Sequence, residues 1–224
     1  MIRSLEAGEW GPGDAIPSEG ELAARFNVSQ GTVRKAIDEM ASENLLIRRQ
    51  GKGTFVASHD DPRSFYRFLR LVPDDGKVWQ GESVPLSCAI RAAGAEVAGT
   101  LGLAAGAPVI YVERVLRFNG EPVVFDQIYL VPELFPGLTL ERLSGGDRSL
   151  YSVFENDYGV RMIHAEERLR AVAADLYSAG LLGVASGAPL LLVERTAYTY
   201  GNKPVEWRRG LYCTNHHHYR NDLG

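Results

Sequence analysis

The chain contains little cysteine and no long apolar run. Its two cysteines, Cys88 and Cys213, have neither CxxC spacing nor histidine partners, so neither a zinc finger nor a disulfide framework is predicted. No stretch of about twenty apolar residues occurs, and the N-terminus lacks a charged segment followed by an apolar one, which argues against a membrane-spanning helix and a secretory signal. These absences predict a protein of the reducing cytoplasm that has no membrane partner, metal or cofactor.

The chain also lacks an overall positive charge, because its net charge is -4 over 224 residues. A hydrophobic content of 45% is enough for two modest domains, each with its own core. Basic residues nevertheless gather locally, since six of them lie from Arg25 to Lys52 against three acidic residues. When a protein binds nucleic acid, only the basic side chains placed at its phosphates release bound counterions. A local excess of basic residues therefore matters more for such binding than the net charge of the chain does.

Residues 17–56 have the pattern of two short helices joined by a tight turn. Ser18 and Glu21 have the spacing of a capping box, and apolar residues follow at helical intervals. Ser29 can cap a second helix, whose apolar side leaves polar residues exposed at its start. Such a pair is the helix-turn-helix arrangement, whose second helix enters the major groove of DNA. The residues predicted on its outer face are Gln30, Gly31, Thr32, Arg34 and Lys35.

A small hairpin is predicted directly after the second helix, from Leu45 to Arg49 and from Thr54 to Val56. Its tip reads Gln50-Gly51-Lys52-Gly53. The glycines let the backbone approach a neighbour closely, and the lysine suits a phosphate. The hairpin is therefore a second element expected to touch DNA.

Residues 2–56 resemble the winged helix-turn-helix of the GntR family of bacterial transcription regulators. The resemblance rests on Pro17-Ser18-Glu19, Glu21-Leu22-Ala23, Val28-Ser29, Thr32-Val33-Arg34 and the segment from Gly51 to Val56. A homodimer on a palindromic double-stranded DNA operator is expected, because one helix reads only a half-site. The residues expected to contact DNA are Ser29, Gln30, Thr32, Arg34, Lys35, Gln50, Gly51 and Lys52.

Two positions of the expected reading surface depart from the family pattern. Gly20 and Gln30 stand where family members commonly carry arginine. Two guanidiniums that could contact guanine or phosphate are thereby lost, while Gln30 could hydrogen-bond adenine instead. An atypical operator is expected, and a regulator with impaired DNA binding is an alternative. Family members also carry an additional turn or two of helix at the start, so the chain is expected to begin late.

A change in composition marks the domain boundary. Residues 57–63 are polar, contain a proline and lack periodicity, as a hinge does. We predict a DNA-binding domain at residues 1–57, a linker at 58–66 and a second domain at 67–224.

The second domain contains an internal duplication, in which residues 101–130 recur at 182–212. Leu-Gly, Gly-Ala-Pro, Val-Glu-Arg and Pro-Val segments repeat in the same order, with one residue inserted near Asn202. Each copy predicts a strand, a hairpin turn and a returning strand. Helical stretches are expected before the copies, at 93–101 and 173–182. Two such units side by side predict an α+β domain with an antiparallel sheet and flanking helices.

Residues 65–220 resemble the UTRA effector-sensing domain of the HutC subfamily of GntR regulators. Matching segments are Gly120-Glu121-Pro122, Leu134 to Leu138, Ser149-Leu150-Tyr151 and Pro204-Val205-Glu206. The resemblance implies a chorismate lyase-like fold that binds a small molecule, and hence a ligand-controlled repressor rather than an enzyme. The predicted effector-binding residues are Arg114, Asp126, Ser149, Tyr151, Arg195, Glu206 and Arg208.

Strand alternation puts Arg114 and Arg195 at equivalent positions on one face of the sheet. A guanidinium can hold a carboxylate or phosphate with two hydrogen bonds, which favours an anionic metabolite such as a sugar phosphate or organic acid. The alternative is structural. Glu113-Arg114 and Glu194-Arg195 could form ion pairs that join the repeats, and Ser149 could be a helix cap.

Other residues have weaker patterns. The consecutive histidines at 216–218 would point to alternating faces of a strand, so they do not predict a metal site. His164 is expected to be packed or hydrogen-bonded in the core, and Tyr66 and Arg70 are further candidate effector contacts.

A chorismate lyase-like enzyme is the alternative function, although no nucleophile with a base and no compelling carboxylate pair is visible. Effector binding is expected to relieve repression by favouring a conformation that no longer matches the half-site spacing.

Overall fold

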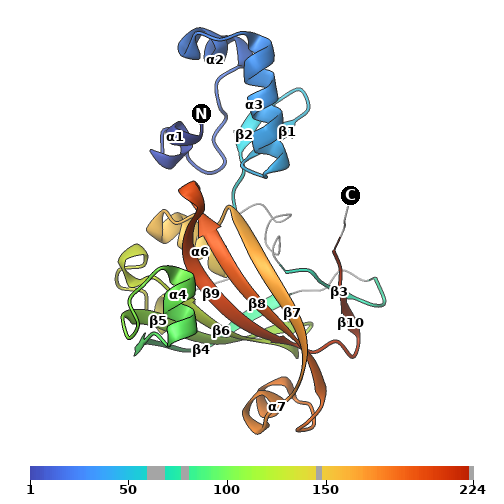
Figure 1. Ribbon diagram of the computed structural model, residues 1–224. Helices are drawn as coiled ribbons and strands as arrows, with labels where there is room; N and C mark the ends of the chain where they lie inside the picture. Colours follow the sequence, from blue (N-terminus) through green and yellow to red (C-terminus); the bar gives the residue numbers. More distant parts are fainter. Residues whose placement is uncertain (60–68, 77–80, 145–147, 222–224) are drawn as a thin grey trace. The chain divides into compact units, whose positions relative to one another are not determined.

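A computed structural model describes residues 1–59, 69–76, 81–144 and 148–221 (Figure 1). The chain divides into two compact units, Met1–Phe65 and Tyr66–Gly224. Tyr66 and most of the predicted linker lie outside the described residues, while Arg70 is exposed and hydrogen-bonds to Asn221. Within the described ranges, no helix is long and apolar enough to cross a membrane.

The first unit is a small helical domain with a two-stranded hairpin. The predicted capping box is present, because the Ser18 side chain accepts from the backbone of Glu21 and the Glu21 side chain accepts from the backbone of Ser18. Asn27 then adopts a left-handed conformation that ends the helix, and Ser29 caps the next one. The predicted helix-turn-helix and hairpin are confirmed. The elements are α1 (Ile2–Glu6), α2 (Glu19–Phe26), α3 (Gln30–Ser42), β1 (Leu46–Arg49) and β2 (Gly53–Val56).

The apolar sides of α2 and α3 form the core of this unit. Leu22 on α2 is 0% exposed. Val33, Ile37 and Met40 on α3 are at most 4% exposed, and they recur at the spacing of one helical face. The opposite face of α3 is therefore left to solvent.

The second unit is built on a six-stranded antiparallel sheet with the order β4-β5-β6-β9-β8-β7. Its strands are β4 (Gly81–Ala92), β5 (Pro108–Phe118), β6 (Glu121–Leu130), β7 (His164–Ala173), β8 (Pro189–Thr199) and β9 (Lys203–Tyr212). A two-stranded sheet pairs β3 (Leu71–Pro73) with β10 (His217–Tyr219). The helices are α4 (Ala95–Leu101), η1 (Pro132–Leu134), α5 (Leu140–Leu143), α6 (Leu150–Tyr158), α7 (Leu176–Leu182) and η2 (Tyr200–Asn202). The predicted α+β class is confirmed.

The duplication appears as two helix-hairpin units, α4-β5-β6 and α7-β8-β9. The helices begin slightly later than predicted, because Gly94 and Asp175 serve as their N-caps. Both end at a left-handed glycine, Gly102 or Gly183. Strands β6 and β9 pair at the centre of the sheet, so the two copies join edge to edge.

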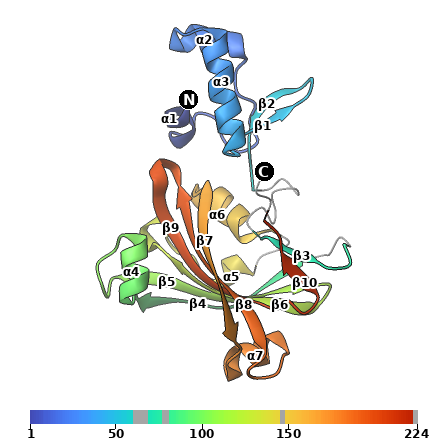
Figure 2. The ribbon, with the colours of Figure 1, turned by 45° about the vertical axis from the view of Figure 1, so that its right-hand side comes forward.

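Different helices cover the two faces of the sheet (Figure 2). On one face, α4 packs against Val109 and α7 against Phe125. On the other face, Phe154 of α6 packs with Ile110 and Val112. We call these the α4–α7 face and the α6 face. The alternation of side chains along each strand assigns every residue of the sheet to one of them.

Candidate DNA-binding surface and effector site

The exposed side of α3 carries the residues predicted to contact DNA. Ser29 accepts a hydrogen bond from the backbone N–H of Thr32 at 3.1 Å, and the two side-chain oxygens lie 2.9 Å apart. Gln30, Arg34 and Lys35 are exposed on the same side of the helix. This is the side that enters the major groove in a helix-turn-helix. Contact of these residues with DNA stays a prediction.

The tip of the hairpin presents the other predicted contacts. Gln50, Gly51 and Lys52 are exposed between β1 and β2. Gly51 and Gly53 have φ angles of 71° and 108°, a region that suits glycine because it has no Cβ. The backbone N–H of Lys52 donates to the carbonyl of Arg49 at 2.9 Å. The turn therefore holds Lys52 at the end of the hairpin, where a phosphate could reach it.

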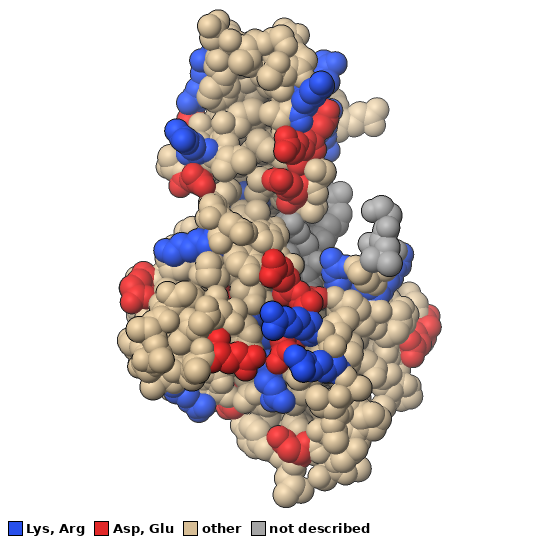
Figure 3. Space-filling model, in the orientation of Figure 1, with Lys and Arg blue, Asp and Glu red and all other residues tan. Residues whose placement is uncertain are grey.

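Carboxylates neutralise part of the positive charge on this unit. Arg34 pairs with Glu19, Arg48 with Asp38 and Arg25 with Glu9. At least half of the six basic residues between Arg25 and Lys52 are therefore in ion pairs. Acidic and basic side chains lie next to one another on the first unit in Figure 3. The local positive excess is smaller than the sequence count suggests.

Buried charged side chains cross the α6 face of the large sheet. We call the set formed by Arg114, Asp126, Arg195, Glu206 and Arg208 the polar band, and each of its members is at most 7% exposed. The strand register places Arg114 opposite Asp126 and Arg195 opposite Arg208. The predicted location of both repeat arginines on one face is confirmed. The structure therefore brings together five of the seven predicted effector-binding residues in one row of neighbouring strands.

Apolar residues enclose the polar band on both sides. Along β5, Ile110 and Val112 lie on one side of Arg114, and Leu116 and Phe118 lie on the other. Each charged group is thus taken out of water, and that desolvation must be offset by close pairing.

Asp126 is the acceptor that two guanidiniums share. Arg114 donates to Oδ2 from Nε at 2.9 Å, and its Nη2 lies 2.8 Å from the same oxygen. Arg208 donates to Oδ2 from Nη1 at 3.2 Å. The third nitrogen of Arg114, Nη1, reaches Ser83 Oγ only at 3.5 Å. Asp126 Oδ1 is buried and has no hydrogen-bond partner among the described residues, so it can accept a further bond.

Helix α6 is tied to the polar band by Tyr151. Arg208 donates to both oxygens of Glu206, at 2.8 and 3.0 Å. Tyr151 donates to Glu206 Oε1 at 3.1 Å, and its ring lies 5.4 Å from the guanidinium carbon of Arg208. At the start of the same helix, Ser149 accepts from the backbone N–H of Ser152 at 3.1 Å. The alternative interpretation of Ser149 as a helix cap is confirmed.

Arg195 is paired with residues that the sequence patterns did not indicate. Its Nε donates to Glu167 Oε1 on β7 at 2.7 Å, and Glu167 also accepts from Tyr219 on β10. Glu167 is the direct strand partner of Arg195. That relation could be found only once β7 was known to pair with β8, whereas no pattern in the sequence points to Tyr219 or Ser83.

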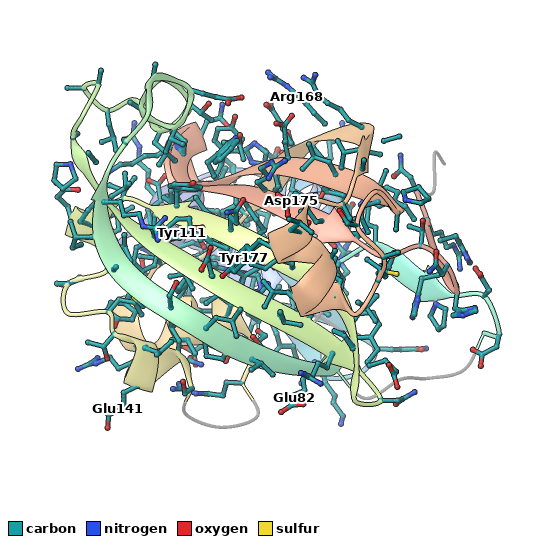
Figure 4. The ribbon with its side chains drawn as sticks, turned by 90° about the horizontal axis from the view of Figure 1, so that it is seen from below. Glu82, Tyr111, Glu141, Arg168, Asp175 and Tyr177 are labelled. Atoms are coloured by element: carbon teal, nitrogen blue, oxygen red, sulfur yellow. The ribbon has the colours of Figure 1, made fainter. Side chains whose placement is uncertain are left out.

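The alternative in which Glu113-Arg114 and Glu194-Arg195 form ion pairs that join the repeats is not supported by the contacts of the described residues. Successive residues of a strand point to opposite faces of the sheet. Glu113 lies on the α4–α7 face, where it accepts from Tyr111 at 2.6 Å and from Tyr177 at 3.2 Å. Figure 4 labels these two tyrosines. Glu194 lies 3.4 Å from Arg170. In the described contacts, neither Glu113 nor Glu194 therefore pairs with the arginine that follows it in the chain.

The histidines do not form a metal site in the described part of the chain, where no group of three or more suitable side chains is found. His218 Nδ1 lies 2.8 Å from Asp74 Oδ1. The prediction of a core position for His164 is wrong. Its side chain is exposed on the edge strand β7 and stacks on Tyr198 with ring centroids 4.6 Å apart.

The charges of the polar band keep the carboxylate of Asp126 ionised. Burial alone would raise the pKa of Asp126, but Arg208 and then Arg114 lower it by more, so the pKa lies below its usual value. Burial also raises the pKa of Tyr212 to about 12 and raises that of Tyr151. Both phenols therefore keep their protons at neutral pH and can act as hydrogen-bond donors.

The stability conferred by Asp126 should depend on pH in a defined direction. A carboxyl group whose pKa is lowered by folding contributes stability above its unfolded pKa, near 3.8, and loses it as the pH falls through the folded value. Urea denaturation of wild type and Asp126→Asn should therefore give free energies of unfolding that differ at pH 7 and converge below about pH 4. If the difference in free energy of unfolding between the two proteins stayed constant from pH 7 to below about pH 4, the expectation would be contradicted.

A winged helix-turn-helix and a separate sheet with a buried polar site together define a transcription regulator with a sensor domain. Residues 1–56 match the gntR family of bacterial regulatory proteins, and residues 82–218 match the UTRA domain. The chain belongs to the GntR family and carries a UTRA effector-binding domain, the combination found in the HutC subfamily. It is a DNA-binding regulator controlled by a small molecule.

Known proteins similar to this chain are also regulators. The uncharacterised HTH-type transcriptional regulator YurK of Bacillus subtilis is 30% identical over 94% of this chain and 87% of its own length. The HTH-type transcriptional repressor NagR of Bacillus subtilis is 27% identical over 93% of this chain and 85% of its own. A crystal structure of the ligand-binding domain of a proposed GntR-family regulator from Bordetella bronchiseptica is 49% identical. Its TM-score is 0.69, with 71% of this chain and 99% of that one covered. These relatives are regulators, so the alternative of a chorismate lyase-like enzyme is not supported.

Proposed function

We propose that this regulator is a repressor that binds a palindromic operator as a homodimer and releases it when a small anionic metabolite binds at the polar band. The observation that carries this proposal is the band itself. Five charged side chains are buried where the adjoining positions of the same strands are apolar. Buried ion pairs are often no more stabilising than apolar side chains of similar volume, so stability alone does not account for them. The name of the relative NagR supports repression.

Two atoms of the band indicate the chemistry of the ligand. Asp126 Oδ1 lacks a donor among the described residues, and a ligand hydroxyl would supply one. Among the described residues, Arg114 Nη1 has only the 3.5 Å contact to Ser83, at the outer limit of a hydrogen bond. A phosphate or carboxylate oxygen would bond this nitrogen at a shorter distance and with a charge-assisted bond. A sugar phosphate or a hydroxylated organic acid satisfies both atoms.

Tyr151 could transmit ligand binding at the polar band to helix α6. It holds α6 to Glu206, and Glu206 in turn holds Arg208. A ligand that bonds to the band would compete with these contacts and favour a different position of α6. Binding of effector and binding of DNA are then linked reciprocally, because each ligand favours one of two conformations. A dimer fits the role of α3, since one such helix reads one half of a palindrome.

Arg114→Lys is expected to desensitise the protein to its effector without weakening DNA binding. Lysine keeps a positive charge beside Asp126 but lacks the planar fork. Loss of a charged hydrogen bond worth about 1.5–3 kcal/mol should raise the effector concentration needed for release by about 10- to 100-fold. DNA selected from a random library by the full chain would serve as operator. Release would be measured by fluorescence anisotropy with a panel of sugar phosphates and hydroxylated organic acids, and sedimentation would give the number of chains per DNA.

Arg117→Lys is the matched control, because Arg117 lies on the same strand but donates to the carbonyl of Gly120 instead of the band. Its response should equal that of the wild type. An unchanged response of Arg114→Lys would make Arg114 a structural residue. Failure of every panel compound to release wild-type protein would count against an anionic effector.

A further inference from the structure

Glu19 and Arg34 form an ion pair between the two helices of the helix-turn-helix, and we call this pair the fork. Glu19 is the first residue of α2, and Arg34 is on the exposed side of α3. Arg34 donates from Nε to the two oxygens of Glu19 at 3.2 and 3.0 Å and from Nη2 to Oε2 at 2.7 Å. The contact therefore uses one defined edge of the guanidinium.

A planar guanidinium has two edges that can each make a pair of parallel hydrogen bonds. One edge is formed by Nε and Nη2, and this edge faces Glu19. The end edge, formed by Nη1 and Nη2, is turned away from the carboxylate. An end edge of this kind matches the two acceptors of guanine, N7 and O6, in the major groove. Glu19 thus fixes Arg34 in an orientation that suits one particular base.

We propose that Glu19 is a positioning residue for operator recognition, which holds Arg34 so that its end edge reads a guanine. The inference rests on the proposed function, because it requires α3 to bind operator DNA. Glu19 does not itself contact the base. Its role is to limit the orientations of a long side chain before DNA arrives, so that less conformational freedom is lost on binding.

The surroundings of Glu19 favour this role. Arg48 on β1 lies 3.8 Å from Glu19 and 2.7 Å from Asp38, so the carboxylate is held from the hairpin as well as from α3. The hydrogen bond from Arg34 lowers the pKa of Glu19, and the carboxylate is therefore ionised at neutral pH. Exposed ion pairs contribute little to stability. The fork is therefore better explained by orientation than by stabilisation of the fold.

The next residue shows how close the start of α2 lies to the reading end of α3. A Cβ placed on Gly20 would be 3.4 Å from Nε2 of Gln30. The two positions that depart from the family pattern are therefore neighbours in space, and neither supplies a guanidinium. Arg34 is then the arginine that remains on this side of α3, and its orientation decides whether the operator contains a guanine at that point.

The test compares the full-length wild type with Glu19→Ala, Arg34→Ala and the double variant on DNA selected from a random library. In the wild type, changing the guanine that Arg34 reads should weaken binding by about 10- to 100-fold. In Glu19→Ala the same base change should matter less than about 3-fold, and adding Arg34→Ala should cause no further loss of discrimination. Binding to DNA without that guanine should be unchanged or tighter, since a negative charge near the phosphates has been removed.

Glu9→Ala is the matched control, because Glu9 pairs with Arg25 in the same domain and should leave base discrimination unchanged. Retained discrimination in Glu19→Ala, with loss in Arg34→Ala, would overturn the inference. Equal weakening on all DNA together with a lower melting temperature would assign Glu19 a structural role and also overturn it. Selection of no DNA by the wild type would defeat the proposed function, whereas selection that is independent of Glu19 would defeat this inference alone.

Discussion

Asp126→Ala is expected to lower the free energy of unfolding by about 3–5 kcal/mol, the cost of removing one partner from a buried ion pair. Asp126 Oδ2 is shared by Arg114 and Arg208, and all three side chains are at most 9% exposed. Without the carboxylate, two guanidiniums face each other in a poorly hydrated site. Urea denaturation of the full chain at pH 7 would measure the loss.

A surface pair gives the control for this substitution. Asp157 lies 2.8 Å from Arg148, but their side chains are 26% and 41% exposed. Asp157→Ala should cost only about 0–1 kcal/mol. Asp126→Asn keeps an oxygen acceptor and should fall between the two, which preserves the comparison if the alanine variant does not fold. Equal costs for Asp126→Ala and Asp157→Ala would show that the band is well hydrated.

Gly210→Ala is expected to destabilise the protein by about 1–3 kcal/mol through overpacking. A Cβ at Gly210 would lie 2.5 Å from Cε1 of Tyr212 and 2.8 Å from Oδ1 of Asp126. Tyr212 is 1% exposed, so its ring has little room to move aside. The substitution would therefore also push on the carboxylate that holds the polar band together, and the thermal unfolding midpoint should fall.

Gly99→Ala provides the opposite expectation for the same chemical change. Gly99 lies in α4 and is exposed, and a Cβ added to it would meet no heavy atom of the described residues within 4 Å, apart from its chain neighbours and the backbone of its own helix. Alanine there should be neutral or stabilising by up to about 1 kcal/mol, because glycine weakens a helix. A Gly210→Ala protein as stable as the wild type would mean that Tyr212 relaxes without cost.

Local patterns in the sequence were sufficient for the first unit and for the arrangement within each repeat. The capping box at Ser18 and the cap at Ser29 involve residues three positions apart, so the sequence alone specifies them. The common face of Arg114 and Arg195 follows from alternation along strands. These features depend on neighbours in the chain, and they were predicted correctly.

Contacts between distant segments could not be obtained in this way. The partner of Arg195 is Glu167, which is brought to it by the pairing of β7 with β8. Glu19 meets Arg34 because of how two helices cross, and no spacing in the sequence encodes that crossing. The alternative of an ion pair between Glu113 and Arg114 is not supported, for a related reason. Proximity along a strand is not proximity in space, because side chains alternate between faces.

The joining of β6 to β9 has a consequence for the sequences of the two repeats. Alignment of the repeats at Pro122 and Pro204 places Asp126 and Arg208 at equivalent positions, and these two side chains meet at 3.2 Å. Two identical repeats would have brought together two aspartates or two arginines, which repel each other strongly in a buried site. The site therefore requires the two copies to differ at these equivalent positions. One copy supplies the carboxylate and the other supplies the guanidinium.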